Sequence, residues 1–223
     1  MAGELFAAIK RGDKSEVERI LDRDRDLVDA RDENGLSPTL VALYYGKSDI
    51  ATAILARAPK LNVFEAAAAG DTARVREILG QDRGQVNAVS QDGFSPLGLA
   101  AFFKRREIVR YLLEAGADTH PASRQGGFTA LHSAVATDAG AVDVEIVRLL
   151  LDKGADPNAK AQSGSTPLHT VGFTGDRASL DLLLKHGADR ATKNNDGKTS
   201  AEIAHERGHE EIADLLAIRA VKR

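Results

Sequence analysis

The sequence predicts an all-α solenoid in which short two-helix units repeat along the chain and stack on one another. Two observations predict this fold. A serine or threonine, in three cases followed by proline, opens a helix-like segment five times, and turn glycines from Gly93 onward recur at a nearly constant spacing. The five motifs are Ser37-Pro38-Thr39-Leu40, Ser95-Pro96-Leu97-Gly98, Thr129-Ala130-Leu131-His132, Thr166-Pro167-Leu168-His169 and Thr199-Ser200-Ala201-Glu202. Such a unit cannot bury its apolar face alone, so it must stack on its neighbours.

The spacing of the turn glycines sets the repeat length. Gly93, Gly127, Gly164 and Gly197 are separated by 34, 37 and 33 residues, and Gly35 precedes Gly93 by 58. The first part of the chain repeats at the same offset of 58, for example at Phe6 and Phe64, Val17 and Val75, and Ser37-Pro38 and Ser95-Pro96. We therefore expect one domain, 1–223, of about seven helix-turn-helix repeats. Their expected bounds are 2–34, 35–59, 60–92, 93–126, 127–163, 164–196 and 197–223.

The segment 164–193 shows how each unit is expected to fold. Thr166 can cap a helix through its hydroxyl, and Pro167 suits the first helical position, where an amide hydrogen has no partner. Gly175 interrupts this first helix, and Gly187 can end the second in a left-handed conformation. The second helix has leucines at helical spacing: Leu180, Leu183 and Leu184.

Two units depart from this pattern. The third opens with Asn62-Val63-Phe64-Glu65 and lacks both the turn glycine and the Thr-Pro pair, so we expect a short loop before it. The fifth is longer, and its extra residues fall within 137–143, between its two helices. Elsewhere, Asn194-Asn195-Asp196-Gly197 and Gln91-Asp92-Gly93 indicate hairpin turns.

These residues resemble the ankyrin repeat family, whose first helix opens on Thr-Pro-Leu-His. Thr166-Pro167-Leu168-His169, followed by Leu182-Leu183-Leu184-Lys185-His186-Gly187-Ala188-Asp189, carries the resemblance most closely, and it extends over essentially the whole chain. The resemblance implies an ankyrin-repeat α-solenoid with short β-hairpin loops. It implies a non-catalytic scaffold that binds a protein or peptide in a concave groove. It also implies that His132 and His169 tie adjacent loops through their ring nitrogens.

Composition narrows the setting. The chain has 223 residues and no cysteine, and the absence of cysteine excludes disulfides and thiolate metal sites. Its net charge of −3 gives little electrostatic attraction for nucleic acid or a membrane surface. No apolar run approaches the roughly 18 residues of a membrane span, and no signal peptide is evident. We expect a cytoplasmic monomer without cofactor or metal.

Two other motifs have tempting interpretations. The segment 205–209 reads His-Glu-Arg-Gly-His, the H-E-x-x-H pattern of zinc proteases, which requires one continuous helix. Gly208 occupies the position at which a unit's first helix ends, so we expect the two histidines not to converge. Lys104-Arg105-Arg106 with Arg110 forms a small basic cluster, which we expect to be solvated surface rather than a nucleic-acid site.

The aromatic residues are the candidate binding residues. In the family, the groove is lined by the residue after the turn glycine and by the pair before the glycine that ends the first helix. Aromatics fill both kinds of position: Phe94 and Phe128, then Tyr44, Tyr45, Phe102, Phe103 and Phe173. The loop tips would add polar contacts: Arg31, Glu33, Gln91, Arg124, Gln125, Gln162, Asn194 and Asn195. If the rings face a partner, Tyr45→Ala with Phe103→Ala leaves thermal stability nearly intact; the alternative is that some rings, Phe94 and Phe128 first, seal repeat junctions.

Two other functions stay open at this stage. The chain could be a regulatory or inhibitor subunit of one specific enzyme, which would purify as a single 1:1 complex. It could also be an enzyme with a site in the groove, although no nucleophile and base, or pair of carboxylates, stand at a useful spacing.

Overall fold

The computed structural model describes residues 1–90, 93–138 and 141–217. Contacts divide the chain into two compact units, Met1–Gln85 and Val86–Arg223. The described residues form fourteen α-helices and two 3₁₀ helices, η1 (Arg25–Asp29) and η2 (Arg83–Asn87), with no strand and one isolated antiparallel bridge. The predicted all-α solenoid is thereby confirmed, while the number and bounds of the repeats stay a prediction.

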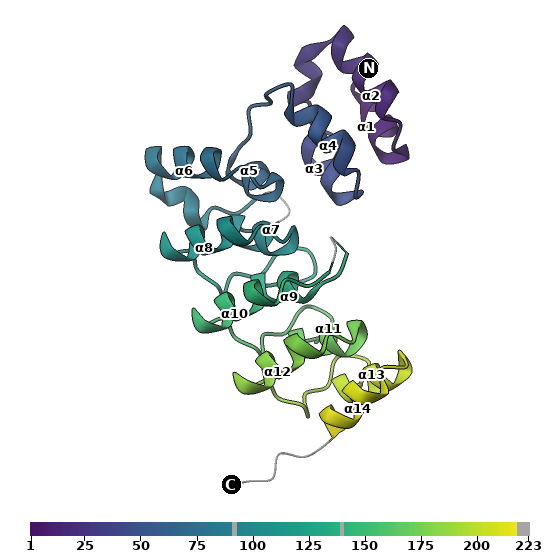
Figure 1. Cartoon of the computed structure of the whole chain (residues 1–223), viewed down its shortest axis with the longest axis vertical. Helices are drawn as coiled ribbons and strands as arrows, with labels where there is room; N and C mark the ends of the chain where they lie inside the picture. The colour runs from purple at the N-terminus through teal and green to yellow at the C-terminus, as the bar shows by residue number, and fades with distance from the viewer. Residues whose placement is uncertain (91–92, 139–140, 218–223) are drawn as a thin grey trace. The chain divides into compact units, whose positions relative to one another are not determined.

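The first unit consists of three helix pairs, shown in purple to blue in Figure 1. They are α1 (Ala2–Arg11) with α2 (Lys14–Arg23), α3 (Pro38–Tyr44) with α4 (Ser48–Leu55), and α5 (Val63–Ala69) with α6 (Thr72–Gln81). The first members pack in a row, α1 against α3 and α3 against α5, and α2 packs against α4 in a second row. Leu5, Ile9, Leu21, Ile50 and Ile54 are fully buried in the core between the rows.

The second unit repeats this arrangement with four pairs (Figure 1). They are α7 (Pro96–Phe102) with α8 (Arg106–Glu114), α9 (Ala130–Val135) with α10 (Val144–Asp152), α11 (Pro167–Thr174) with α12 (Arg177–Lys185), and α13 (Ser200–Glu206) with α14 (Glu210–Ala217). The helices α7, α9, α11 and α13 pack in one row, and α8, α10 and α12 in another. Neighbouring pairs within this unit thus pack against one another, which is the packing that tandem repeats require.

The helices of the first row begin where the sequence motif predicts. The hydroxyls of Ser37, Ser95 and Thr199 accept hydrogen bonds from amides three residues into the helix, at 3.3, 3.0 and 3.3 Å. Such caps satisfy an amide that has no partner within the helix. Thr166 also precedes its helix, as predicted, and forms a capping box with His169. In this box the Thr166 hydroxyl lies 2.9 Å from His169 Nδ1.

The loops between successive helix pairs are tight turns whose two arms are joined by backbone hydrogen bonds. Each first arm donates an amide to a carbonyl of the second arm, from Asp32 to Leu36, Ser90 to Phe94, Ser123 to Phe128, Ala161 to Ser165 and Asn194 to Lys198, at 2.8 to 3.0 Å. The one bridge, Lys193 with Thr199, lies at the last of these turns. The predicted hairpin loops are therefore present as turns, without extended strands in the described residues.

Asparagine side chains join successive repeats next to the C-terminal ends of second-row helices. Asn158 accepts a hydrogen bond from the Asp189 amide at 2.7 Å and donates one to the Gly187 carbonyl at 3.0 Å. Asn87 makes the equivalent pair of contacts with Asp118, at 2.8 Å, and Gly116, at 3.4 Å. Each amide satisfies backbone groups that the preceding helix leaves without partners.

The two irregular repeats, the third and the fifth, fold as their sequences predict. Residues 56–62 form a short link between α4 and α5, and Asn62 with Glu65 makes a reciprocal capping box in place of the Thr-Pro opening. In the fifth repeat, α9 ends at Val135 and α10 begins at Val144, so the extra residues do fall between its two helices. Residues 139–140 lie outside the described residues.

The basic cluster after α7 is solvated surface only in part: Arg106 and Arg110 are exposed as expected, whereas Lys104 and Arg105 are half-buried. Lys104 has a positive φ of 59° at the turn and is half-buried. Its ammonium donates to the carbonyl oxygens of Ser133, Ala134 and Ala136, at 3.3, 3.0 and 2.7 Å, and so caps the end of the short helix α9. Burial lowers the pKa of Lys104 to about 8. Arg106 pairs with Asp143 at 2.9 Å.

Candidate protein-binding surface

The segment 205–209 does not have the geometry of a protease zinc site. Gly208 takes a φ of 76° between the end of α13 and the start of α14, so no continuous helix carries both histidines. His205 Nδ1 instead lies 2.9 Å from a carboxylate oxygen of Glu210, and the His209 ring bonds a backbone carbonyl of α11. Within 1–90, 93–138 and 141–217, no cluster of three side chains is placed to hold a metal ion.

The two motif histidines are buried and connect neighbouring loops, as the family resemblance implies. In each, Nδ1 accepts from the amide of the threonine that precedes the helix, and Nε2 donates to a carbonyl of the next loop. The contacts of His132 are Thr129 N at 3.3 Å and Ser165 O at 3.2 Å, and those of His169 are Thr166 N at 3.1 Å and Lys198 O at 3.1 Å. This pattern fits a neutral ring with its proton on Nε2.

We expect these two histidines to make the protein less stable in mild acid. Burial lowers the pKa of His132 and of His169, outweighing the bonds to Ser165 and Lys198 carbonyls that raise it. The folded pKa thus lies below the unfolded value of roughly 6.5, so the unfolded chain takes up protons first. The free energy of unfolding should be highest above about pH 7 and fall as the pH passes through 6.5. Urea unfolding between pH 7.5 and 5.5 measures it.

The control for this prediction is a His132→Gln, His169→Gln variant, which should lose most of the decline. Both proteins should also carry His205→Gln, because the Glu210 carboxylate raises the pKa of His205 and would contribute the opposite pH dependence. An unchanged slope in the double glutamine variant would show that other groups cause the effect.

The structure separates the seven predicted aromatic residues into three groups. Tyr45, Phe128 and Phe173 are exposed, at 51, 44 and 47%. Tyr44, Phe94 and Phe102 are half-buried. Phe103 is only 6% exposed and meets Phe102 edge to face, with 5.0 Å between ring centroids. Of the two rings expected first to seal repeat junctions, Phe94 is half-buried and Phe128 is exposed. Phe103, which we expected on the binding surface, belongs to the core.

Two of the exposed rings are held in place by neighbouring polar groups. The Arg207 guanidinium lies 3.7 Å from the Phe173 ring centroid, a stacked cation–π contact. His209 Nε2 lies 3.2 Å from the Phe173 carbonyl oxygen, so the turn after α13 holds Phe173 twice. In the first unit, the Lys10 ammonium lies 5.9 Å from the Tyr45 ring centroid. Sequence reasoning missed Arg207 and Lys10, although Arg207 lies one repeat length after Phe173 and alignment of the repeats could have paired them.

Several predicted loop-tip residues are engaged within the fold. Gln162 bonds the Arg124 carbonyl at 2.9 Å and the Gly126 amide at 3.2 Å, and Asn195 bonds the Gln162 carbonyl at 2.9 Å. Asn194 accepts from the Asp196 and Lys198 amides of its own turn, and Arg31 pairs with the buried Glu65. These side chains join one loop to the next or shape a turn, so they are less available to a partner than the sequence suggested.

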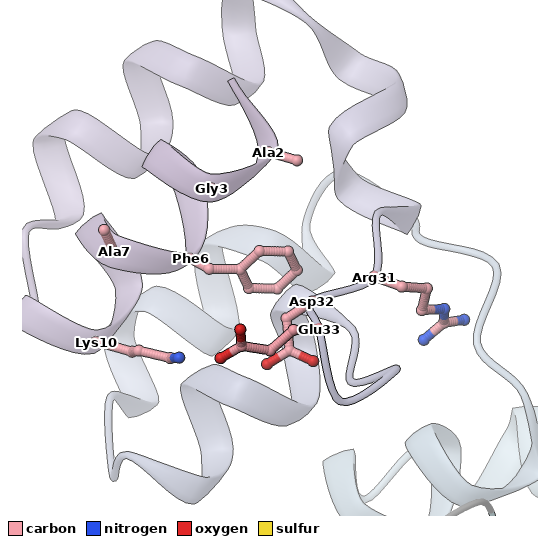
Figure 2. A pocket seen from close by; sticks show the side chains of 8 residues that line it. All are labelled: Ala2, Gly3, Phe6, Ala7, Lys10, Arg31, Asp32 and Glu33. Carbon is pink, nitrogen blue, oxygen red and sulfur yellow. The ribbon is translucent and has the colours of Figure 1, made fainter.

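The side chains of the other described loop-tip residues are available to a partner. Among the described residues, no hydrogen bond or ion pair holds the side chains of Glu33, Arg124 or Gln125, whereas Gln91 lies outside the described residues. Glu33 also lines a cavity of about 400 Å³ in the first unit, together with Ala2, Gly3, Phe6, Ala7, Lys10, Arg31 and Asp32 (Figure 2). Exposed rings and free polar tips therefore occur in both units, at the ends of α3 and α11 and on the turns between successive helix pairs.

Comparison with known families agrees with the repeated helix pairs. A family model described as "Ankyrin repeats (3 copies)" matches residues 63–161 and 139–222, more than half of the chain. This chain belongs to the ankyrin repeat family. The family is in general a non-enzymatic protein-interaction fold, and the ankyrin repeats support a protein-interaction role here. Across the described stretches, no helix is both long and apolar enough to cross a lipid bilayer.

Similar ankyrin repeat segments occur in curated proteins of several kinds. The chain is 40% identical over 55 residues to mouse ARF GTPase-activating protein GIT2, covering 25% of this chain and 8% of that protein. It is 38% identical over 99 residues to the Arabidopsis thaliana E3 ubiquitin-protein ligase KEG, covering 44% and 6%. It is 34% identical over 139 residues to the putative ankyrin repeat protein FPV031 of fowlpox virus, covering 59% and 39%. The chain thus spans less than two thirds of each of these relatives.

Proposed function

We propose that this chain is a non-catalytic scaffold that binds a protein or peptide along the first-row helices and the turns between units. Within the second unit, the proposed contact surface is centred on Phe128 and Phe173, and within the first unit on Tyr45. The observation that carries the proposal is the exposure of these three large rings at the positions where ankyrin repeats vary. Exposed aromatics offer large contact area at little entropic cost, and they dominate the energetics of many interfaces.

The rest of the proposal concerns setting and partners. We propose a cytoplasmic monomer with a protein or peptide partner, without nucleic acid, membrane or cofactor. The small net charge of −3 supports the absence of nucleic-acid binding, since such proteins usually carry a basic surface. The enzymatic names of GIT2 and KEG belong to proteins of which this chain matches less than a tenth, so they support no activity here.

The proposal is tested by capture of a partner followed by binding to that purified partner. We expect Phe128→Ala with Phe173→Ala to weaken the dissociation constant by at least roughly tenfold, because two hot-spot rings are lost. A matched control is Arg110→Ala with Arg148→Ala, two exposed residues on the second-row helices α8 and α10. Equal affinity of the aromatic variant and the control would show that the partner binds elsewhere.

The same experiment distinguishes the remaining functions. A regulatory or inhibitor subunit would form one stable 1:1 complex in which the partner's activity changes, whereas a scaffold would hold several proteins or leave activity unchanged. Turnover that copurifies with this chain alone, in a broad hydrolase screen, would revive an enzymatic role.

A further inference from the structure

The cavity of the first unit has an apolar floor and a charged rim. Its floor comes from one side of α1, where Ala2, Gly3, Phe6 and Ala7 succeed one another at helical spacing. The rim comes from Lys10 at the end of that helix and from the turn after η1, which contributes Arg31, Asp32 and Glu33. At about 400 Å³ the cavity lies near the small end of ligand pockets, enough for one long side chain and its adjoining backbone.

The two cations of this rim already have partners. Arg31 pairs with Glu65, a residue that is 1% exposed, and in Figure 2 the Arg31 guanidinium points away from Asp32 and Glu33. The Lys10 ammonium lies over the Tyr45 ring, and no ion pair links it to either acid in the part of the chain that the structure describes. Both positive groups are therefore engaged with groups of the protein.

The two anions of the rim are available. One carboxylate oxygen of Asp32 accepts from the Asn34 and Leu36 amides, both at 2.9 Å, which fixes the side chain and leaves its other oxygen free to accept. Glu33, next in the chain, has no hydrogen bond or ion pair among the described residues. In Figure 2 the Lys10 ammonium faces these carboxylates, but it forms no ion pair with them among the described residues. Two adjacent carboxylates beside an apolar floor suit a positively charged group that also brings an aliphatic stem.

We propose that this cavity binds an arginine side chain of a partner protein or peptide. The arginine methylenes would pack on Ala2, Gly3 and Ala7 of α1 and on the small exposed part of Phe6, which is 5% exposed. The guanidinium would donate to Glu33 and to the free oxygen of Asp32. A planar guanidinium can contact two carboxylate oxygens and stack on an aromatic ring, whereas a lysine ammonium is a compact, strongly hydrated point charge. This inference rests on the proposed protein-binding function and names one chemical feature of its partner.

The test uses the full chain, labelled with ¹⁵N, and three capped tripeptides. They are acetyl-Gly-Arg-Gly-amide, its citrulline analogue, which keeps the shape without the charge, and its glutamate analogue. We expect the arginine peptide alone to shift the amide signals of Gly3, Ala7 and Glu33 in a saturable way. Equal shifts with the citrulline peptide, or shifts with the glutamate peptide instead, would overturn the proposal.

Variants locate the binding group. Glu33→Gln should weaken arginine-peptide binding by roughly fivefold, and Lys10→Met should strengthen it because a nearby like charge is removed. Asp49→Asn, which removes one exposed negative charge on α4 in the same unit, should leave it unchanged. Wild-type affinity in Glu33→Gln, or an equal loss in Asp49→Asn, would contradict the assignment. Because the readout lies in the first unit and uses a defined peptide, it can fail while Phe128 and Phe173 still bind a partner.

Discussion

Replacing Phe103 with alanine should lower the free energy of unfolding by about 3–5 kcal/mol, the usual cost of truncating a buried phenylalanine. Phe103 is 6% exposed, follows the last residue of α7 and contacts Phe102 edge to face at 5.0 Å. Its removal would leave a cavity where the first-row helix turns toward α8, and a cavity adds to the lost burial. Urea unfolding followed by circular dichroism measures the change.

Tyr45→Ala is the matched control, because the two rings occupy equivalent positions at the ends of α3 and α7. Tyr45 is 51% exposed, so its loss should cost less than about 1 kcal/mol, including its contact with Lys10. The Tyr45→Ala, Phe103→Ala double variant, which sequence reasoning expected to be nearly as stable as the wild type, should instead unfold about as easily as Phe103→Ala alone. Similar, small effects of both single changes would show that Phe103 is not part of the core.

The fold was predictable because its signals are local. A serine or threonine cap, a proline at the first helical position and a glycine after the last turn each specify a helix boundary over a few residues. Their recurrence at one spacing identified the stacked pairs, and the long fifth unit was visible as extra residues before Asp143. What local signals do not specify is the partner of a side chain one repeat away. Two contacts are of this kind: the Lys104 ammonium donates to a carbonyl at the end of α9, and Arg31 forms an ion pair with Glu65.

The candidate site was harder to predict for a geometric reason. Phe102 and Phe103 are adjacent, and successive residues of a helix point about 100° apart, so one of the two must turn toward the core while its neighbour does not. The sequence shows the pair but not which ring turns inward. The loop tips pose a similar problem, because Gln162 and Asn195 can bond either a partner or the next loop, and their spacing of one repeat favours the next loop.

Gly172→Ala should also destabilise the second unit, against the rule that alanine favours a helix. Gly172 lies within α11, and a Cβ built there would lie 2.4 Å from the carbonyl oxygen of Ser200, the first residue of α13. Backbone cannot yield as a flexible side chain does, so α13 must move away from α11. We expect a net loss of about 1–3 kcal/mol, the typical cost of overpacking, which exceeds the roughly 1 kcal/mol that alanine gains in helix propensity.

Gly98→Ala separates the clash from the effect on helix propensity. Gly98 occupies the middle of α7, where a Cβ would meet Ser95 Oγ at 3.4 Å and Phe94 Cδ1 at 3.7 Å, both ordinary contact distances. This variant should be unchanged or more stable by up to about 1 kcal/mol. Hydrogen exchange adds a second measurement, since faster exchange confined to the amides of α13 and α14 is expected only for Gly172→Ala. If the two glycine variants gave equal stability and equal exchange, the close approach of Gly172 to the Ser200 carbonyl would not be what limits the packing of α11 against α13.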